Sequence, residues 1–187
     1  MWDTTMGQGY RAIILASEQP NERELIRTWV DSGVYGNGYK LCEHSYIGNK
    51  YVEAVEYLIS PLGMFHKSRL VWAGDYADDE QGLSANLHTM TYDDIIEQKM
   101  SSPNRYDMSA YRYIVNHTRK IYVDKNIETE TMYHPLPLLT AEGNGRGGGD
   151  CTHSNCKMLS LIGTWARHTI SVEIDIPEGY AQLMCEF

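Results

Sequence analysis

Residues 169–176 read TISVEIDI, and this stretch has the clearest two-residue periodicity in the 187-residue chain. Isoleucine and valine alternate with polar residues, so an extended backbone would place all the apolar side chains on one face. A strand with one apolar and one polar face is typical of an antiparallel sheet, because parallel sheets are usually covered on both faces. The stretch therefore predicts a strand with one solvent-facing side in an antiparallel sheet.

Other apolar runs bounded by turn residues predict further strands along the whole chain. Two of them flank residues 116–119, which is the pattern of a β-hairpin. The predicted strands outside 169–176 cover residues 10–16, 39–46, 68–76, 111–115 and 120–124.

Helical spacing of apolar residues is concentrated in the first hundred residues. Residues 21–33 combine a capping-box spacing with an apolar stripe. A second helix capped by Asn49 would end before Pro61, and a short third helix would begin at Thr91. Strands dominate the second half, and this segregation predicts an α+β fold: a mostly antiparallel β-sheet with two or three helices drawn mainly from the N-terminal half. The length predicts a single domain, 1–187.

The chain is acidic and rich in tyrosine. It has 16 basic and 25 acidic residues, a formal charge of -9, and 14 tyrosines against 2 phenylalanines. Generic nucleic-acid binding and binding to anionic membranes both need clustered basic residues, so we expect neither. No apolar run approaches the ~20 residues that span a bilayer, and the N-terminus lacks the layout of a signal peptide. We therefore expect a cytoplasmic protein with reduced cysteines.

The most unusual segment is a glycine-rich loop at residues 143–150. Each glycine adds to the entropy that folding must overcome, so five of them around one arginine favour a binding role over a plain connector. Successive backbone N–H groups could turn toward an anion, and the arginine could hold a phosphate or carboxylate. A solvent-exposed connector is the alternative. The predicted ligand-binding residues are Gly143, Asn144, Gly145, Arg146, Gly147, Gly148, Gly149 and Asp150.

Candidate catalytic residues are few. His134 and Asp150 could meet across the loop as an acid–base pair, although His134 could equally cap a strand end. Asp75 begins an acidic cluster that continues at residues 78–80, and such oxygens suit hard cations or a basic partner. Complete catalytic motifs are missing, so the sequence favours a protein that is not an enzyme.

Soft metal ligands gather at residues 151–156. Cys151, His153 and Cys156 could supply three zinc ligands, but structural zinc sites usually pair two such motifs and no second half follows. We therefore expect inert thiols here, with no metal and no cofactor.

Several phrases together resemble a group of small uncharacterised proteins from bacteria and their phages. They are GNGYKL (36–41), VWAGDYAD (71–78), YIVNHTRKIYVD (113–124), HPLPLLTAEGNGRGGGD (134–150) and GTWARHTISVE (163–173). The resemblance covers about one third of the chain and carries over no catalytic residue. It implies an intracellular single-domain protein, and it leaves open a role in phage–bacteria conflict, as an immunity or anti-defence factor.

Three functions remain open from the sequence. The first is a non-catalytic binding protein that recognises a small anionic, nucleotide-like ligand or a protein partner through the loop 143–150. The second is a hydrolase or transferase acting on a phosphate-containing substrate with His134, Arg146 and Asp150. The third is an acidic mimic that blocks the basic surface of a partner.

Overall fold

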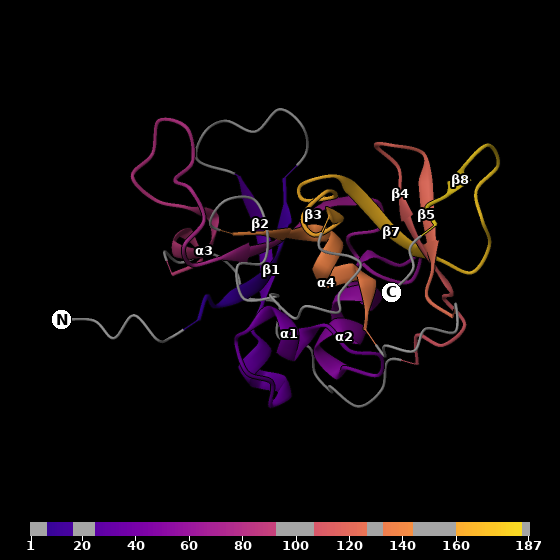
Figure 1. The fold of residues 1–187 in the computed structure, drawn as a ribbon, viewed down its shortest axis with the longest axis horizontal. Coiled ribbons are helices and arrows are strands. Elements are labelled where there is room, and N and C mark those ends of the chain that lie inside the picture. The colour runs from indigo at the N-terminus through magenta and orange to yellow at the C-terminus, as the bar shows by residue number, and fades with distance from the viewer. Residues whose placement is uncertain (1–6, 17–24, 93–106, 127–132, 144–159, 185–187) are drawn as a thin grey trace.

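The fold is an α+β arrangement built on one sheet. The computed structural model describes residues 7–16, 25–92, 107–126, 133–143 and 160–184 (Figure 1). In these ranges eight strands form a mostly antiparallel sheet of order β2-β1-β3-β7-β4-β5-β8, with β6 paired to β3. The predicted fold class is therefore confirmed. The strands are β1 (Tyr10–Leu15), β2 (Ile26–Val30), β3 (Ser68–Gly74), β4 (Tyr113–Asn116), β5 (Ile121–Asp124), β6 (Ala141–Glu142), β7 (Thr169–Glu173) and β8 (Ala181–Gln182).

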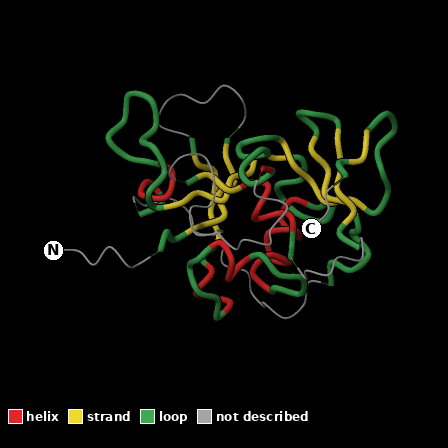
Figure 2. Tube along the Cα trace, in the orientation of Figure 1, coloured by secondary structure: helices red, strands yellow, loops and turns green. Residues whose placement is uncertain are grey.

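Helices cover both faces of the sheet, unequally (Figures 1 and 2). The larger core contains residues of α1, α2 and α4, whereas α3 contributes to a smaller apolar cluster on the opposite face of β1 and β3. Three of these four helices come from the first half of the chain, as predicted. The helices are η1 (Ser32–Tyr35, 3-10), α1 (Leu41–His44), α2 (Lys50–Ile59), α3 (Leu87–Met90) and α4 (Pro135–Thr140).

Strand β1 is buried on both faces because it lies between these two layers. Tyr10, Ala12 and Ile14 belong to the larger core, and Ile13 and Leu15 belong to the smaller cluster. Successive side chains of a strand point to opposite faces. The one charged residue of the strand, Arg11, therefore points toward α3, and it is only 8% exposed.

Two predicted elements are wrong. The region predicted as a helix over 21–33 contains β2, in which Ile26, Thr28 and Val30 are buried against β1. These buried positions alternate along the strand, but Trp29 on the other face adds a large apolar side chain. The apolar residues of the sequence therefore have a spacing that resembles a helical stripe. The predicted strand 39–46 is instead α1, whose first turn is fixed by Lys40 N–H donating to Glu43 Oε2 at 2.8 Å.

Element boundaries also differ from the prediction. Thr91 follows α3 as its C-cap instead of beginning a helix. Helix α4 was not predicted; Pro135 occupies its first turn, where a missing N–H is harmless. Strand β7 ends at Glu173, where its pairing with Tyr113 of β4 also ends. Ile174 and Ile176 consequently lie beyond the sheet and are 52% and 40% exposed.

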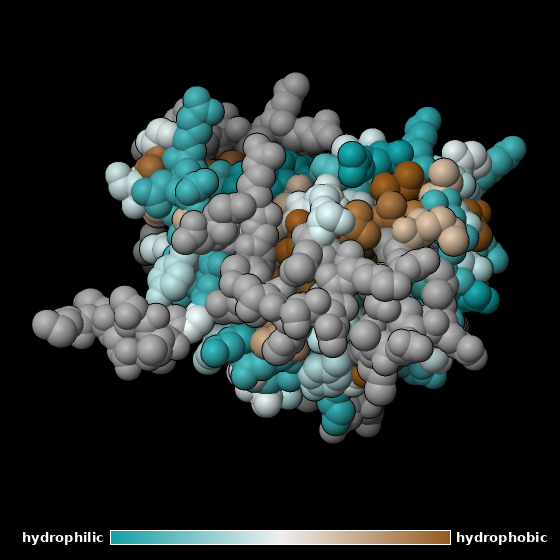
Figure 3. All heavy atoms as spheres, viewed as in Figure 1, coloured by the Kyte–Doolittle hydropathy of each residue, from teal (hydrophilic) through white to brown (hydrophobic). Residues whose placement is uncertain are grey.

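The helix predicted from Asn49 is confirmed as α2. The Asn49 side chain accepts hydrogen bonds from the backbone N–H groups of Tyr51 and Val52, which leaves fewer free donors at the helix start. The hairpin of β4 and β5 is likewise confirmed. No helix in the described ranges is both long and apolar enough to cross a bilayer. Figure 3 shows exposed apolar residues on the side that carries β4, β5 and β8.

Candidate functional site

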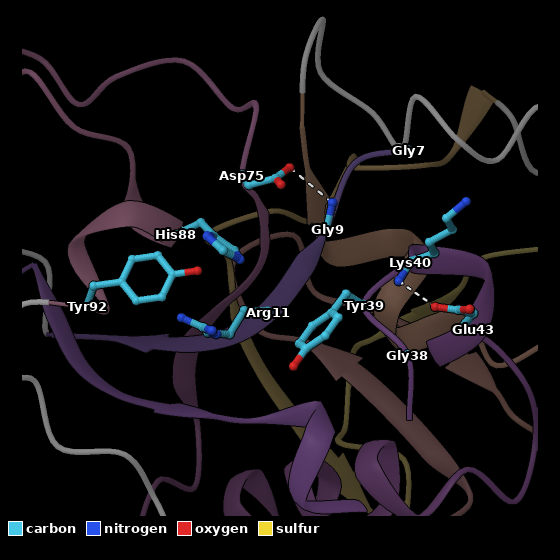
Figure 4. A pocket seen from close by; sticks show the side chains of 10 residues that line it. All are labelled: Gly7, Gly9, Arg11, Gly38, Tyr39, Lys40, Glu43, Asp75, His88 and Tyr92. Carbon is cyan, nitrogen blue, oxygen red and sulfur yellow. Dashed lines mark hydrogen bonds between the residues drawn. The ribbon is translucent and has the colours of Figure 1, made fainter. Parts of the chain in front are cut away.

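A pocket of about 750 Å³ opens beside the N-terminal end of β1 (Figure 4). Four segments that are distant in sequence meet there: the residues that lead into and begin β1, the turn before α1 with the start of that helix, the residue after β3, and α3 with the second residue after it. The lining residues are Gly7, Gly9, Arg11, Gly38, Tyr39, Lys40, Glu43, Asp75, His88 and Tyr92.

Arg11 is the most deeply buried of the charged side chains that line the pocket. Its guanidinium carbon lies 4.1 Å from the ring centroid of Trp29 and 5.0 Å from that of Tyr92. One terminal nitrogen, Nη1, donates a hydrogen bond to Thr91 Oγ1. Within the described ranges no carboxylate forms an ion pair with it. A buried arginine is normally paired with an acid, so this one stands out.

The aromatic contacts orient the arginine. Rings on the guanidinium faces leave its N–H groups pointing outward in the plane, which is the geometry that binds a carboxylate or phosphate through two parallel hydrogen bonds. Thr91 uses one of those groups. Among the described residues the guanidinium donates no other hydrogen bond, so its other N–H groups can donate to an anion in the pocket.

His88 is a second buried polar side chain of the pocket, 6% exposed. Burial, and then the positive charge of Arg11, lower the pKa of His88 to about 4. The imidazole is therefore neutral near pH 7. Its ring packs edge-on to Tyr92, 5.8 Å between centroids, and neither ring nitrogen has a hydrogen-bond partner among the residues that the structure describes. Figure 4 shows it between Asp75 and Arg11.

The two carboxylates of the pocket are engaged by backbone groups. Asp75 Oδ1 accepts a hydrogen bond of 3.0 Å from Gly9 N–H, and Glu43 accepts the N–H of Lys40. The carboxylates thus fix the walls of the pocket, and neither of them is ion-paired with Arg11 in the part of the chain that the structure describes.

The candidate residues from the sequence are dispersed in the structure. Asp75 lines the pocket, but His134 lies elsewhere, between α2 and β5. Of the glycine-rich loop only Gly143 is described, and it lies against Gln8 and Tyr10. The other candidates lie outside the described residues: Asn144, Gly145, Arg146, Gly147, Gly148, Gly149, Asp150, Cys151, His153 and Cys156.

His134 belongs to a buried polar triad. Its Nδ1 accepts the backbone N–H of Leu136 at 3.2 Å, so Nε2 carries the proton and faces Glu56 Oε1, also at 3.2 Å. Lys125 Nζ lies 2.7 Å from the same oxygen. Burial alone would raise the pKa of Glu56, but His134 and Lys125 together hold it below the ordinary value. Both nitrogens of His134 therefore have structural partners.

The acidic cluster after β3 is split between two places: Asp75 lines the Arg11 pocket, and Glu80 binds Arg167. Glu80 and Glu142 both bind the guanidinium of Arg167, whose Nε lies 2.7 Å from Glu142 Oε2. Burial opposes the charge of Arg167, but the two carboxylates outweigh it and raise its pKa. Among the described residues no group of three or more His, Cys, Asp or Glu side chains could hold a metal ion.

Sequence reasoning missed Arg11, His88 and Tyr92. A charged residue inside the apolar run YRAIILA (10–16) was the available signal, because such a strand buries both faces. Comparison with known proteins found no matching family model, no matching curated protein and no matching solved structure. The function is therefore argued from the geometry of the pocket.

Proposed function

We propose that this protein binds a small anionic ligand in the Arg11 pocket, without catalysing a reaction. The observation that carries the proposal is the buried guanidinium of Arg11, which faces a pocket of about 750 Å³ with no carboxylate partner in the described ranges. Removing a charge from water costs several kcal/mol unless a partner compensates it. A bound phosphate or carboxylate would provide that compensation.

The site is also organised in advance. Trp29 and Tyr92 hold the guanidinium plane and Thr91 binds one of its nitrogens, so little side-chain freedom remains to be lost on binding. Pre-organisation raises affinity mainly by reducing such entropic costs. A solvent-exposed arginine would lack this advantage, which is why we place the anion at Arg11.

The glycine-rich loop 143–150 stays a predicted contributor. A Cβ at Gly143 would lie 2.5 Å from the hydroxyl of Tyr10 and closer still to Gln8 Oε1, so the loop starts against the segment that forms one wall of the pocket. Tyr10 points into the larger core, on the opposite face of β1 from Arg11, and its hydroxyl binds Gln8. A contribution of the loop to the Arg11 site therefore rests on its sequence alone.

Catalysis is less well supported than binding. A general base works best with a pKa near the working pH, and the pKa of His88 is about 4. Asp75 already accepts a hydrogen bond from Gly9, and the described residues that line the pocket include no serine, threonine or cysteine. A hydrolase or transferase using His134, Arg146 and Asp150 stays an untested alternative.

Calorimetric titration tests the proposal. Inorganic phosphate and ribose 5-phosphate are titrated at low ionic strength into wild type, Arg11→Met and Arg119→Met. Arg119 is exposed in the β4–β5 turn and serves as the matched control. Charge-assisted hydrogen bonds contribute about 1.5–3 kcal/mol each, so Arg11→Met should weaken binding at least about ten-fold while Arg119→Met should not. Equal binding by Arg11→Met and wild type, or no binding at all, would refute the proposal.

A further inference from the structure

We infer that the ligand carries a planar heteroaromatic ring beside its anionic group, as a nucleoside monophosphate does, and that the ring stacks on Tyr39. This inference rests on the proposed function, because it assumes that the anion lies at Arg11. It adds the class of the ligand and a second recognition element.

The pocket is large enough for more than an oxyanion. Its volume is about 750 Å³, whereas a water molecule in the liquid takes up about 30 Å³ and pockets for small organic ligands range from about 300 to 1,000 Å³. An inorganic phosphate on Arg11 would leave most of the space empty. A mononucleotide-sized molecule fits the range.

Tyr39 offers a fixed and open aromatic surface. Its side chain is 55% exposed, yet its carbonyl accepts the backbone N–H of Tyr10 at 2.6 Å. An aromatic ring on an immobilised backbone, lining a pocket, is suited to stacking on a base.

The opposite wall supplies complementary polar groups. Figure 4 shows Tyr39 and Tyr92 on opposite sides of Arg11. Tyr92 contacts Arg11 and His88, so Tyr39 is the better stacking surface. The neutral ring of His88 has one N–H donor and one acceptor nitrogen. It can therefore pair with the mixed donors and acceptors at the edge of a heterocycle.

The test compares ligands that differ only in the ring. AMP, UMP and ribose 5-phosphate are titrated calorimetrically into wild type, Tyr39→Ala and Tyr39→Phe, with Tyr46→Ala as control. Tyr46 is also exposed, at 44%, and does not line the pocket. Indole-3-acetate, an aromatic carboxylate, distinguishes a general ring-bearing anion from a nucleotide.

Stacking on an aromatic side chain should make at least one nucleotide bind about ten-fold or more tightly than ribose 5-phosphate. Tyr39→Ala should remove that advantage, while Tyr39→Phe and Tyr46→Ala should keep it. If indole-3-acetate binds tightly and the nucleotides do not, the ligand carries an aromatic ring but is not a nucleotide, and the proposed ligand class is wrong. If all the anions bind alike and Tyr39→Ala changes none of them, this inference fails while the anion site stands. If no anion binds the wild type, both fail.

Discussion

Trp72 Nε1 donates a hydrogen bond of 3.0 Å to Nδ1 of His44, and both side chains are fully buried in the larger core. The indole nitrogen can only donate, so Nδ1 of His44 is unprotonated. Its Nε2 then carries the proton and donates to the carbonyl of Gly38 at 3.0 Å. The pair connects β3 to α1 and holds the turn that forms one wall of the Arg11 pocket.

Acid should destabilise the protein through His44. Burial lowers the pKa of His44 to about 4, against an ordinary value of 6.5. Between those pH values the unfolded chain binds a proton that the folded chain does not, so stability rises with pH across the window. The full loss on going from pH 6.5 to pH 4 is about 3 kcal/mol. Urea unfolding at pH 7, 5.5 and 4.5 should show the decline.

NMR measures the pKa of His44 directly. The His44 imidazole resonances should titrate near pH 4, and His44→Asn should reduce the slope of stability against pH between 6.5 and 4. Titration of His44 close to 6.5 would contradict the assigned neutral tautomer and its bond from Trp72.

Lys125→Met should destabilise the fold by about 3 kcal/mol. Glu56 is 1% exposed, and the substitution leaves its carboxylate buried with one partner fewer. The exposed residue Lys120 provides the matched control, since surface substitutions usually change stability by less than about 0.5 kcal/mol. Chemical denaturation measures both variants.

A double variant separates the pair from its surroundings. Lys125→Met with Glu56→Met removes both charges, so it should be more stable than Lys125→Met alone. Additive losses in the double variant would show that the two residues do not interact as the 2.7 Å contact implies.

Arg11→Met should leave the ligand-free protein as stable as wild type, or make it more stable. The substitution removes a buried charge that has no carboxylate partner in the described ranges, and Met keeps an apolar contact with Trp29. Binding sites commonly sacrifice stability in this way. Thermal unfolding without ligand measures the effect, and a fall in Tm of more than about 5 °C would show that Arg11 is structural.

Gly143→Ala should destabilise the protein by about 1–3 kcal/mol, because a new methyl group would overlap Gln8 and Tyr10. Gln8→Ala removes part of that obstruction. The double variant should therefore lose less stability than the sum of the two single variants, as a double-mutant cycle by urea unfolding can establish. Strictly additive losses of stability would show that Gly143→Ala does not destabilise the protein through overlap with Gln8.

Several local features were predictable because neighbouring residues decide them. Asn49 begins α2 through hydrogen bonds to N–H groups two and three residues later, and the β4–β5 hairpin forms around a short turn. Strand β2 was not predictable in this way. Its identity depends on pairing with β1, where Ala12 lies opposite Val30, and that partner is eighteen positions away.

The sequence by itself determined the fold class, a mostly antiparallel sheet with its helices drawn mainly from the first half, because side-chain periodicity and capping act over a few residues. Only the tertiary structure decided which residues come together around Arg11. Arg11, Trp29 and His88 are separated by up to seventy-seven positions, and their contacts exist only after β1, β2 and α3 have packed together. Burial lowers the pKa of His88 and keeps its ring neutral, and burial is a property of the folded chain.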